Sequence, residues 1–189
     1  MTRRTEFADA ALRLVARGGL EAVSIRTVAA EAGWSAGALQ KTLGTKDELL
    51  TAAVERMTER VGARMAALPQ TGDLATDVAA LVQETLPLGA VRREEGLVWT
   101  AVAGRAATVP WMADVLRDQD ATVLGWLTGA VGHARPDEPD PAAVASTVVA
   151  LADGWTTRLL YAPEAADEVL RALDRALALL LAPVDTPHP

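Results

Sequence analysis

Apolar residues recur every three to four positions along most of this chain, which is the spacing of amphipathic α-helices. Glycine and proline clusters interrupt the pattern and mark the expected helix ends. Runs of β-branched residues bounded by turns are scarce, so the expected fold class is all-α, with about nine helices. The pattern predicts helices over residues 24–32, 36–43, 46–68, 73–85, 91–107, 110–131, 142–161 and 164–182, after a first helix that ends at Gly19.

Two short predicted helices and a tight turn occupy residues 24–43. Ser24 is a residue type that caps a helix start, and Gly33 supplies the positive φ that ends the first helix. Ser35 is placed to cap the second helix, so Trp34 lies between the two as the turn. This arrangement is typical of a helix-turn-helix motif, whose second helix enters the major groove of DNA. The pattern therefore predicts DNA binding.

The outward face of the second short helix is small and polar, because Leu39 and Leu43 are expected to point into the core. Gln40 is expected to contact a base, a phosphate or neither, and Lys41 a base or a phosphate. Lys46 begins the next helix behind a capping-box spacing, where a phosphate would be bound. The predicted DNA-contacting residues are Ser24, Arg26, Ser35, Ala36, Gly37, Ala38, Gln40, Lys41, Thr42 and Lys46.

These residues resemble the N-terminal pattern of the TetR family of bacterial transcriptional regulators. In that family a first helix ends at a glycine corner, an alanine-rich helix and a recognition helix follow, and a lysine begins the next helix. The corresponding stretches are residues 12–19, 28–35, 37–39 and 44–46. The resemblance is strong over residues 1–50. It implies a helix-turn-helix repressor, and we expect a homodimer that a small-molecule ligand releases from a palindromic operator.

The chain departs from the family pattern at three places within the motif. Trp34 stands where valine is usual, Gln40 where tyrosine is nearly always found, and Thr42 with Leu43 where an aromatic pair is common. Gln40 lacks the tyrosine hydroxyl that would bind a phosphate. The departures concern the details of DNA contact and not the class of protein.

The middle of the chain is similar to the C-terminal domain of BetI-type members of the same family, through residues 84–88, 98–99 and 151–155. This similarity implies an effector or regulatory domain and no particular ligand. The expected organisation is a three-helix DNA-binding domain over residues 1–50 that continues into the helix 46–68, a larger helical domain for effector binding and dimerisation over residues 51–182, and a disordered tail over residues 183–189.

The last two long predicted helices each carry a broad apolar stripe. Small residues between the stripes would let helices approach closely, as in a four-helix dimer interface. Burial within one chain explains the stripes equally well, but a helix-turn-helix protein needs two copies about 34–36 Å apart to read a palindrome, which favours the dimer. The predicted interface residues are Val144, Val148, Leu151, Leu170, Leu173, Leu177 and Leu180.

Five of the seven aromatic residues are tryptophans. Most tryptophans simply pack in a core, but several of these lie in helices that would surround an effector cavity or build an aromatic cage for a quaternary amine. Arg105 would bind an anionic ligand in such a cavity. The favoured interpretation is that its side chain contacts solvent or an acidic partner instead. The predicted pocket residues are Trp99, Thr100, Arg105, Trp111, Met112, Gln119, Trp126, Trp155 and Arg158.

The net charge of −7 looks unsuited to a DNA-binding protein, but the acidity is unevenly distributed. Residues 1–50 carry seven basic and six acidic groups, whereas residues 51–189 carry eleven and nineteen. A nearly neutral DNA-binding domain with basic groups on one edge can still bind phosphate. We expect its affinity for DNA to depend moderately on salt concentration.

Composition excludes several other classes. Cysteine is absent and the two histidines are far apart in sequence, so we expect no metal and no cofactor. No phosphate loop or nucleophile motif indicates an enzyme. No signal peptide or membrane-spanning stretch is seen, which predicts a cytoplasmic protein without a membrane partner. The expected partners are an operator in double-stranded DNA, an unidentified small-molecule effector and a second copy of the chain. The alternatives are a ligand-independent regulator and a helical protein-interaction module.

Overall fold

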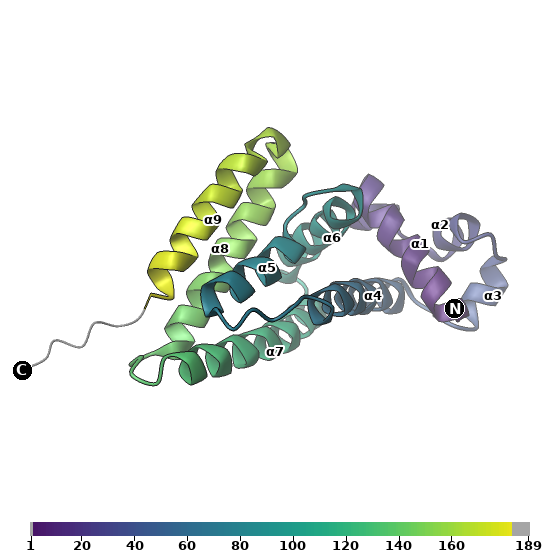
Figure 1. The fold of residues 1–189 in the computed structure, drawn as a ribbon. Helices are drawn as coiled ribbons and strands as arrows, with labels where there is room; N and C mark the ends of the chain where they lie inside the picture. The colour runs from purple at the N-terminus through teal and green to yellow at the C-terminus, as the bar shows by residue number, and fades with distance from the viewer. Residues whose placement is uncertain (1, 183–189) are drawn as a thin grey trace, which may run out of the picture. The chain divides into compact units, whose positions relative to one another are not determined.

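The computed structural model describes residues 2–182, which form nine α-helices, two short 3-10 helices and no strand (Figure 1). The prediction of an all-α fold is confirmed. The predicted tail over residues 183–189 lies outside the described residues. The elements are α1 (Arg3–Gly18), η1 (Leu20–Ala22), α2 (Ile25–Glu31), α3 (Ala36–Gln40), α4 (Lys46–Ala66), α5 (Leu74–Thr85), α6 (Ala90–Ala106), α7 (Pro110–Ala134), α8 (Pro141–Tyr161), η2 (Pro163–Ala165) and α9 (Ala166–Leu180).

Helix α3 is shorter than its sequence pattern predicts. It ends at Gln40 instead of Leu43, and Lys41 is its C-terminal cap residue. The amides of Thr42 and Leu43 both donate to the carbonyl oxygen of Leu39 at 2.8 Å, so the chain tightens into a turn. Lys41 and Thr42 therefore lie in this turn and not on the helix, while Leu43 is buried as predicted.

The described chain folds as two compact units. The first comprises the residues up to 66 together with residues 89–116, and the second comprises residues 67–88 and those from 117 onward. The division predicted after residue 50 falls inside α4. Unit boundaries lie elsewhere because Val54 and Met57, in the middle of α4, are buried in the same core as α1.

Helix α1 is the centre of the first unit and contacts α2, α4 and α6. Its Phe7 and Leu12 are fully buried in one cluster with Leu39 of α3 and Leu49 of α4. Burial of such large apolar side chains is the main favourable term in folding. The short helix α3 is therefore anchored to the unit through Leu39.

Two buried carboxylates fasten α4 within the first unit. Asp9 of α1 accepts hydrogen bonds from Arg56 and Arg60, each at 2.9 Å. Glu95 of α6 accepts two from Arg64, at 3.1 and 2.5 Å. A carboxylate taken out of water needs such paired and hydrogen-bonded partners. Helix α4 is thus tied to both α1 and α6.

The second unit packs α5, α8, α9 and the C-terminal part of α7 around a core that includes Val78, Val148 and Leu173. Helices α8 and α9 lie side by side and are joined through η2 (Figure 1). Beyond the end of α7, Arg135 donates to the carbonyl oxygen of Leu180 at 2.8 Å. None of the helices within residues 2–182 combines the length and apolar content needed to cross a bilayer.

Candidate nucleic-acid interface

Local hydrogen bonds hold α2 and α3 on either side of a sharp turn. The Ser24 hydroxyl accepts from the amide of Thr27 at 3.1 Å, and the Thr27 hydroxyl accepts from the amide of Ser24 at 2.9 Å. Gly33 has a φ of 74°, a left-handed conformation that glycine adopts without strain. The Ser35 hydroxyl accepts from the amide of Ala38 at 3.2 Å and so caps α3. The local geometry is that of a helix-turn-helix motif.

The outward surface of α3 is small and polar, as predicted, and continues into the turn that follows the helix. Small side chains allow a close approach of the backbone to a nucleic acid. Among residues 2–182, no carboxylate pairs with the ammonium group of Lys41, so its charge is available to a phosphate. The exposed residues are Ser35, Ala36, Gly37, Gln40, Lys41 and Thr42, with Ala38 half-buried.

The start of α4 differs from the simple anion site that its sequence suggests. The predicted capping box is present: Thr45 accepts from the amide of Glu48 at 3.1 Å, and Glu48 accepts from the amide of Thr45 at 3.0 Å. Glu48 also accepts from the amide of Gly44 at 2.6 Å. A carboxylate therefore already occupies these amides. The Lys46 side chain is what remains for a phosphate, and it is paired with Glu21 at 3.1 Å.

Two arginines of α1 are occupied by a carboxylate of α2. Arg13 and Arg17 donate to Glu31 at 2.8 and 2.5 Å, and these bonds, led by that from Arg13, hold the pKa of Glu31 below its ordinary value. They tie α2 to α1 but leave neither arginine unpaired. The basic residues in this region without a carboxylate partner among residues 2–182 are Arg3, Arg26 and Lys41.

Trp34, which the sequence presents only as a turn residue, packs against α1. Its indole N–H donates to Glu6 at 2.8 Å, and the guanidinium carbon of Arg3 lies 4.7 Å from its ring centroid. Sequence reasoning missed Arg3 and Glu6. No local signal reveals them, because the contact joins residues about thirty positions apart in the chain.

The nine residues predicted for an effector pocket are divided between the two units. Met112 is buried in the first core, and the Thr100 hydroxyl donates to the backbone carbonyl of Gly96 at 2.8 Å. Trp126 is 52% exposed, and Arg158 is paired with Glu168 at 3.0 Å. Their convergence on one cavity stays a prediction. The first unit holds Trp99, Thr100, Arg105, Trp111 and Met112, and the second holds Gln119, Trp126, Trp155 and Arg158.

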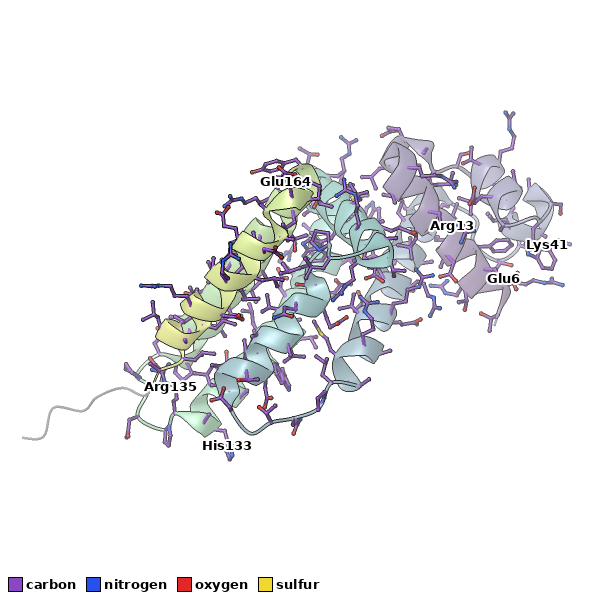
Figure 2. The ribbon with its side chains drawn as sticks, turned by 45° about the horizontal axis from the view of Figure 1, so that its top comes forward. Glu6, Arg13, Lys41, His133, Arg135 and Glu164 are labelled. Carbon is purple, nitrogen blue, oxygen red and sulfur yellow. The ribbon has the colours of Figure 1, made fainter. Side chains whose placement is uncertain are left out.

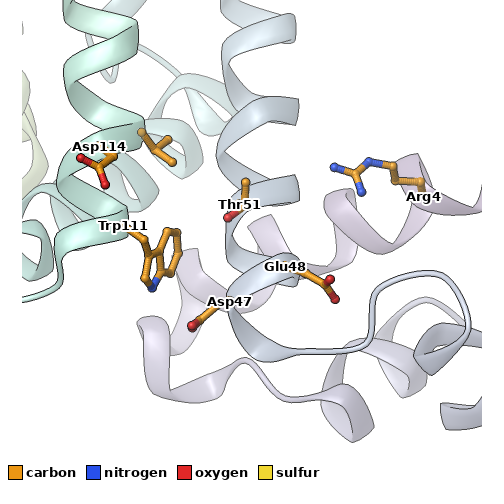
Figure 3. A pocket seen from close by; sticks show the side chains of 7 residues that line it. Arg4, Asp47, Glu48, Thr51, Trp111 and Asp114 are labelled. Atoms are coloured by element: carbon orange, nitrogen blue, oxygen red, sulfur yellow. The ribbon is translucent and has the colours of Figure 1, made fainter.

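An open cavity of about 340 Å³ lies within the first unit (Figure 3). Trp111 lines it and is the predicted pocket residue found there. Its carboxylates outnumber its single arginine, so the lining disfavours anions such as DNA phosphates. The sequence pattern did not reveal this cavity because its residues come from α1, α4 and α7. They are Arg4, Asp47, Glu48, Thr51, Trp111, Asp114 and Val115.

The apolar stripes predicted for a dimer interface are largely used inside the second unit. Val144, Val148, Leu173 and Leu177 are between 0% and 8% exposed within the unit's own core. Leu151, Leu170 and Leu180 are half-buried. Burial within one chain, which periodicity alone could not distinguish from dimerisation, therefore accounts for the four buried residues.

Comparison with known sequences agrees with this geometry. Residues 7–53, from α1 into α4, match the profile of bacterial regulatory proteins of the tetR family. Residues 74–182 match the profile of the C-terminal part of BetI-type transcriptional repressors, which is more than half of the chain. The chain belongs to the TetR family. This TetR-family chain is a transcriptional regulator with a DNA-binding domain, and the proteins it matches are regulators, not enzymes.

Individual TetR-family relatives cover different shares of the chain. The nicotine-responsive transcriptional repressor HdnoR of Paenarthrobacter nicotinovorans is 34% identical over 86 residues, which are 46% of this chain and 43% of that protein. A transcriptional regulator of known structure from Rhodococcus sp. Rha1 is 30% identical, with a TM-score of 0.87 over 95% of this chain and 96% of that one. The multidrug-binding protein EbrR, in complex with proflavin, is 26% identical, with a TM-score of 0.65 over 95% and 99%. The chain thus spans less than half of the curated relative HdnoR.

Proposed function

We propose that this TetR-family chain is a homodimeric repressor that binds a palindromic operator through α3 and leaves it when a small molecule binds. The observation that carries the proposal is the exposed, small and polar surface of α3, which the buried Leu39 anchors. Lys41 at its end has no carboxylate partner among residues 2–182. In this proposal residues 1–50 bind DNA and residues 51–182 bind the effector and dimerise. A bacterial repressor acts on the chromosome, so we place the chain in the cytoplasm.

The exposed side of α8 and α9 supports a dimer interface. It takes the place of the apolar residues predicted for the interface, four of which are buried in the core of the second unit. Tyr161 of α8 is 76% exposed and Leu179 of α9 is 72% exposed. Ala150 and Gly154 of α8 are also exposed and carry little or no side chain, which would let a partner helix approach closely. In such a dimer, two DNA-binding domains related by a two-fold axis match the symmetry of a palindromic site.

Two similar proteins support an effector for this chain. HdnoR is named for its response to nicotine, and EbrR is a multidrug-binding protein observed with proflavin. We propose that a small molecule is the effector of this chain. A regulator without a ligand is the alternative.

Operator binding is tested first with a duplex that the wild-type chain selects from a random-sequence pool. Replacing both Lys41 and Lys46 by alanine should lower affinity at least about tenfold, because two phosphate contacts are lost from each subunit. Replacing both Arg105 of α6 and Arg117 of α7 by alanine is the charge-matched control, since both arginines are exposed. Unchanged affinity of the double variant would contradict DNA binding through these two lysines, and a wild-type chain that selects no duplex would favour the protein-interaction module.

Release by an effector is tested with a thermal-shift screen of small molecules, followed by titration of the selected duplex. A molecule that raises the melting temperature should also weaken DNA binding, because ligand and DNA favour different states of the chain. Stabilising molecules that all leave DNA affinity unchanged would refute the proposed coupling without touching DNA recognition itself.

A further inference from the structure

Trp34, between α2 and α3, contacts three residues near the start of α1. Its indole N–H donates to the Glu6 carboxylate at 2.8 Å, and its ring meets Phe7 edge to face with centroids 6.3 Å apart. The guanidinium carbon of Arg3 lies 4.7 Å from the ring centroid. Arg3, Glu6 and Phe7 are three and four positions apart and so share one face of the helix. Trp34 therefore joins the turn of the motif to the first turns of α1.

The guanidinium group of Arg3 keeps its whole charge available. Arg3 is exposed, and within residues 2–182 no carboxylate is paired with it. The next residue, Arg4, forms an ion pair with Glu55 at 2.6 Å. The two neighbouring arginines therefore differ in whether a carboxylate is paired with them. An aromatic ring attracts a guanidinium through its quadrupole and leaves the positive charge in place. Arg3 is thus restrained without being neutralised.

The place where Arg3 is held lies beside the start of the recognition helix. Trp34 directly precedes Ser35, the residue that caps α3. Figure 2 shows Glu6 of α1 and Lys41 beyond α3 at the same end of the first unit. A duplex that receives α3 in its major groove brings the backbones that border the groove close to the protein around that helix.

We propose that Arg3 binds a DNA phosphate beside the recognition helix and that Trp34 is the residue that positions it. This inference rests on the proposed binding of DNA through α3. The ring restricts the arginine side chain before DNA arrives, so less conformational entropy is lost when the phosphate is bound. Glu6 in turn fixes the plane of the ring through the indole N–H. The contact with Trp34 thereby places the positive charge of Arg3 on the DNA-binding surface.

The test measures affinity for the selected duplex by fluorescence anisotropy over a series of salt concentrations, with the full chain. Arg3→Ala should reduce the slope of log Kd against log salt by about 1 for each Arg3 that binds a phosphate, and weaken binding several-fold at low salt. Trp34→Val should shift both quantities in the same direction. Arg3→Ala should then have little further effect in the Trp34→Val background, because the two residues act together.

Two variants separate positioning from folding. Trp34→Phe keeps an aromatic face for Arg3 and should retain most of the salt slope, although the bond to Glu6 is lost. Arg117→Ala removes an exposed arginine from α7 in the second unit and should leave the slope unchanged. Circular dichroism melting curves show whether each variant is folded, and Arg3→Ala with Trp34→Phe suffices if Trp34→Val unfolds.

Three results would overturn the inference. A folded Arg3→Ala variant with wild-type slope and affinity excludes the phosphate contact. An equal loss from Arg3→Ala in the wild-type and Trp34→Val backgrounds excludes positioning by Trp34. A Trp34→Phe variant that loses as much slope as Arg3→Ala excludes positioning by the aromatic face alone. A wild-type chain that selects and binds no duplex overturns the proposed function together with this inference, which distinguishes that failure from the first two.

Discussion

Lys46 at the start of α4 and Glu21 in η1 form an ion pair, with 3.1 Å between Nζ and Oε2. The side chain of Glu21 is 87% exposed, so the pair lies at the surface. A DNA phosphate would compete with Glu21 for the same ammonium group. Lys46, which the sequence predicts to bind a phosphate, is therefore held by a carboxylate of η1.

Removing the charge of Glu21 should strengthen DNA binding. Glu21→Gln removes the carboxylate that is paired with Lys46, and exposed ion pairs of this kind correspond to about a two- to fivefold change in affinity. The gain should fade at high salt, where surface charges are screened. Anisotropy titrations of the selected duplex measure it, with Glu164→Gln in η2 as the charge-matched control. An affinity gain equal to that of the control would show that Glu21 does not oppose DNA.

Placing a large side chain at Gly154 should break the dimer. Gly154 is exposed on α8, and a Cβ added there meets no atom within 4 Å, so Gly154→Arg fits the isolated protomer. In the proposed interface the arginine would stand where the partner helix approaches. Sedimentation velocity should show a monomer with weakened operator binding. Gly129→Arg on α7, equally open, should remain dimeric, and identical behaviour of the two variants would argue against this surface.

The clamp of Arg13 and Arg17 on Glu31 should make stability depend on pH. Its contacts, chiefly the hydrogen bond from Arg13, lower the pKa of Glu31 below 4.5 in the folded chain. The stabilisation is therefore complete well above pH 4.5 and is lost as pH falls through the lower folded pKa. Glu31→Gln should reduce Tm by a few degrees, roughly 2–4 °C, near neutral pH and by less in acid. Melting curves across this range check it, and a Tm difference independent of pH would contradict it.

Breaking the buried pair of Glu95 and Arg64 should cost more than a surface pair does. The Glu95 side chain is 5% exposed, and Glu95→Ala removes the buried carboxylate that accepts two hydrogen bonds from the half-buried Arg64. We expect the free energy of unfolding to fall by about 3 kcal/mol. Replacing both residues by methionine should recover much of the loss, because the half-buried guanidinium group is then replaced by an apolar side chain. Denaturant titrations measure both variants, and a double variant as unstable as Glu95→Ala would contradict this account.

Features that depend on neighbours in sequence were predictable. Ser24 and Ser35 cap α2 and α3, and Gly33 takes the positive φ that ends α2, because these roles depend on a residue's own side chain and backbone freedom. The end of α3 was not predictable in this way. Hydrogen bonds from Thr42 and Leu43 to Leu39 tighten the chain there, and nothing in the helical spacing of the leucines distinguishes that turn from another turn of helix.

The sequence by itself determined the all-α class, the helix-turn-helix motif and the small, polar surface of α3, since apolar spacing and capping residues act locally. Tertiary structure decided which charges remain available: Lys46 is paired with Glu21, while Arg3 lies against the ring of Trp34 and pairs with no carboxylate of the described residues 2–182. It also decided that Val148 and Leu173 are buried in the core of the second unit. Pairing and burial depend on residues distant in the chain, and a periodic pattern records only that a side chain is apolar, not what covers it.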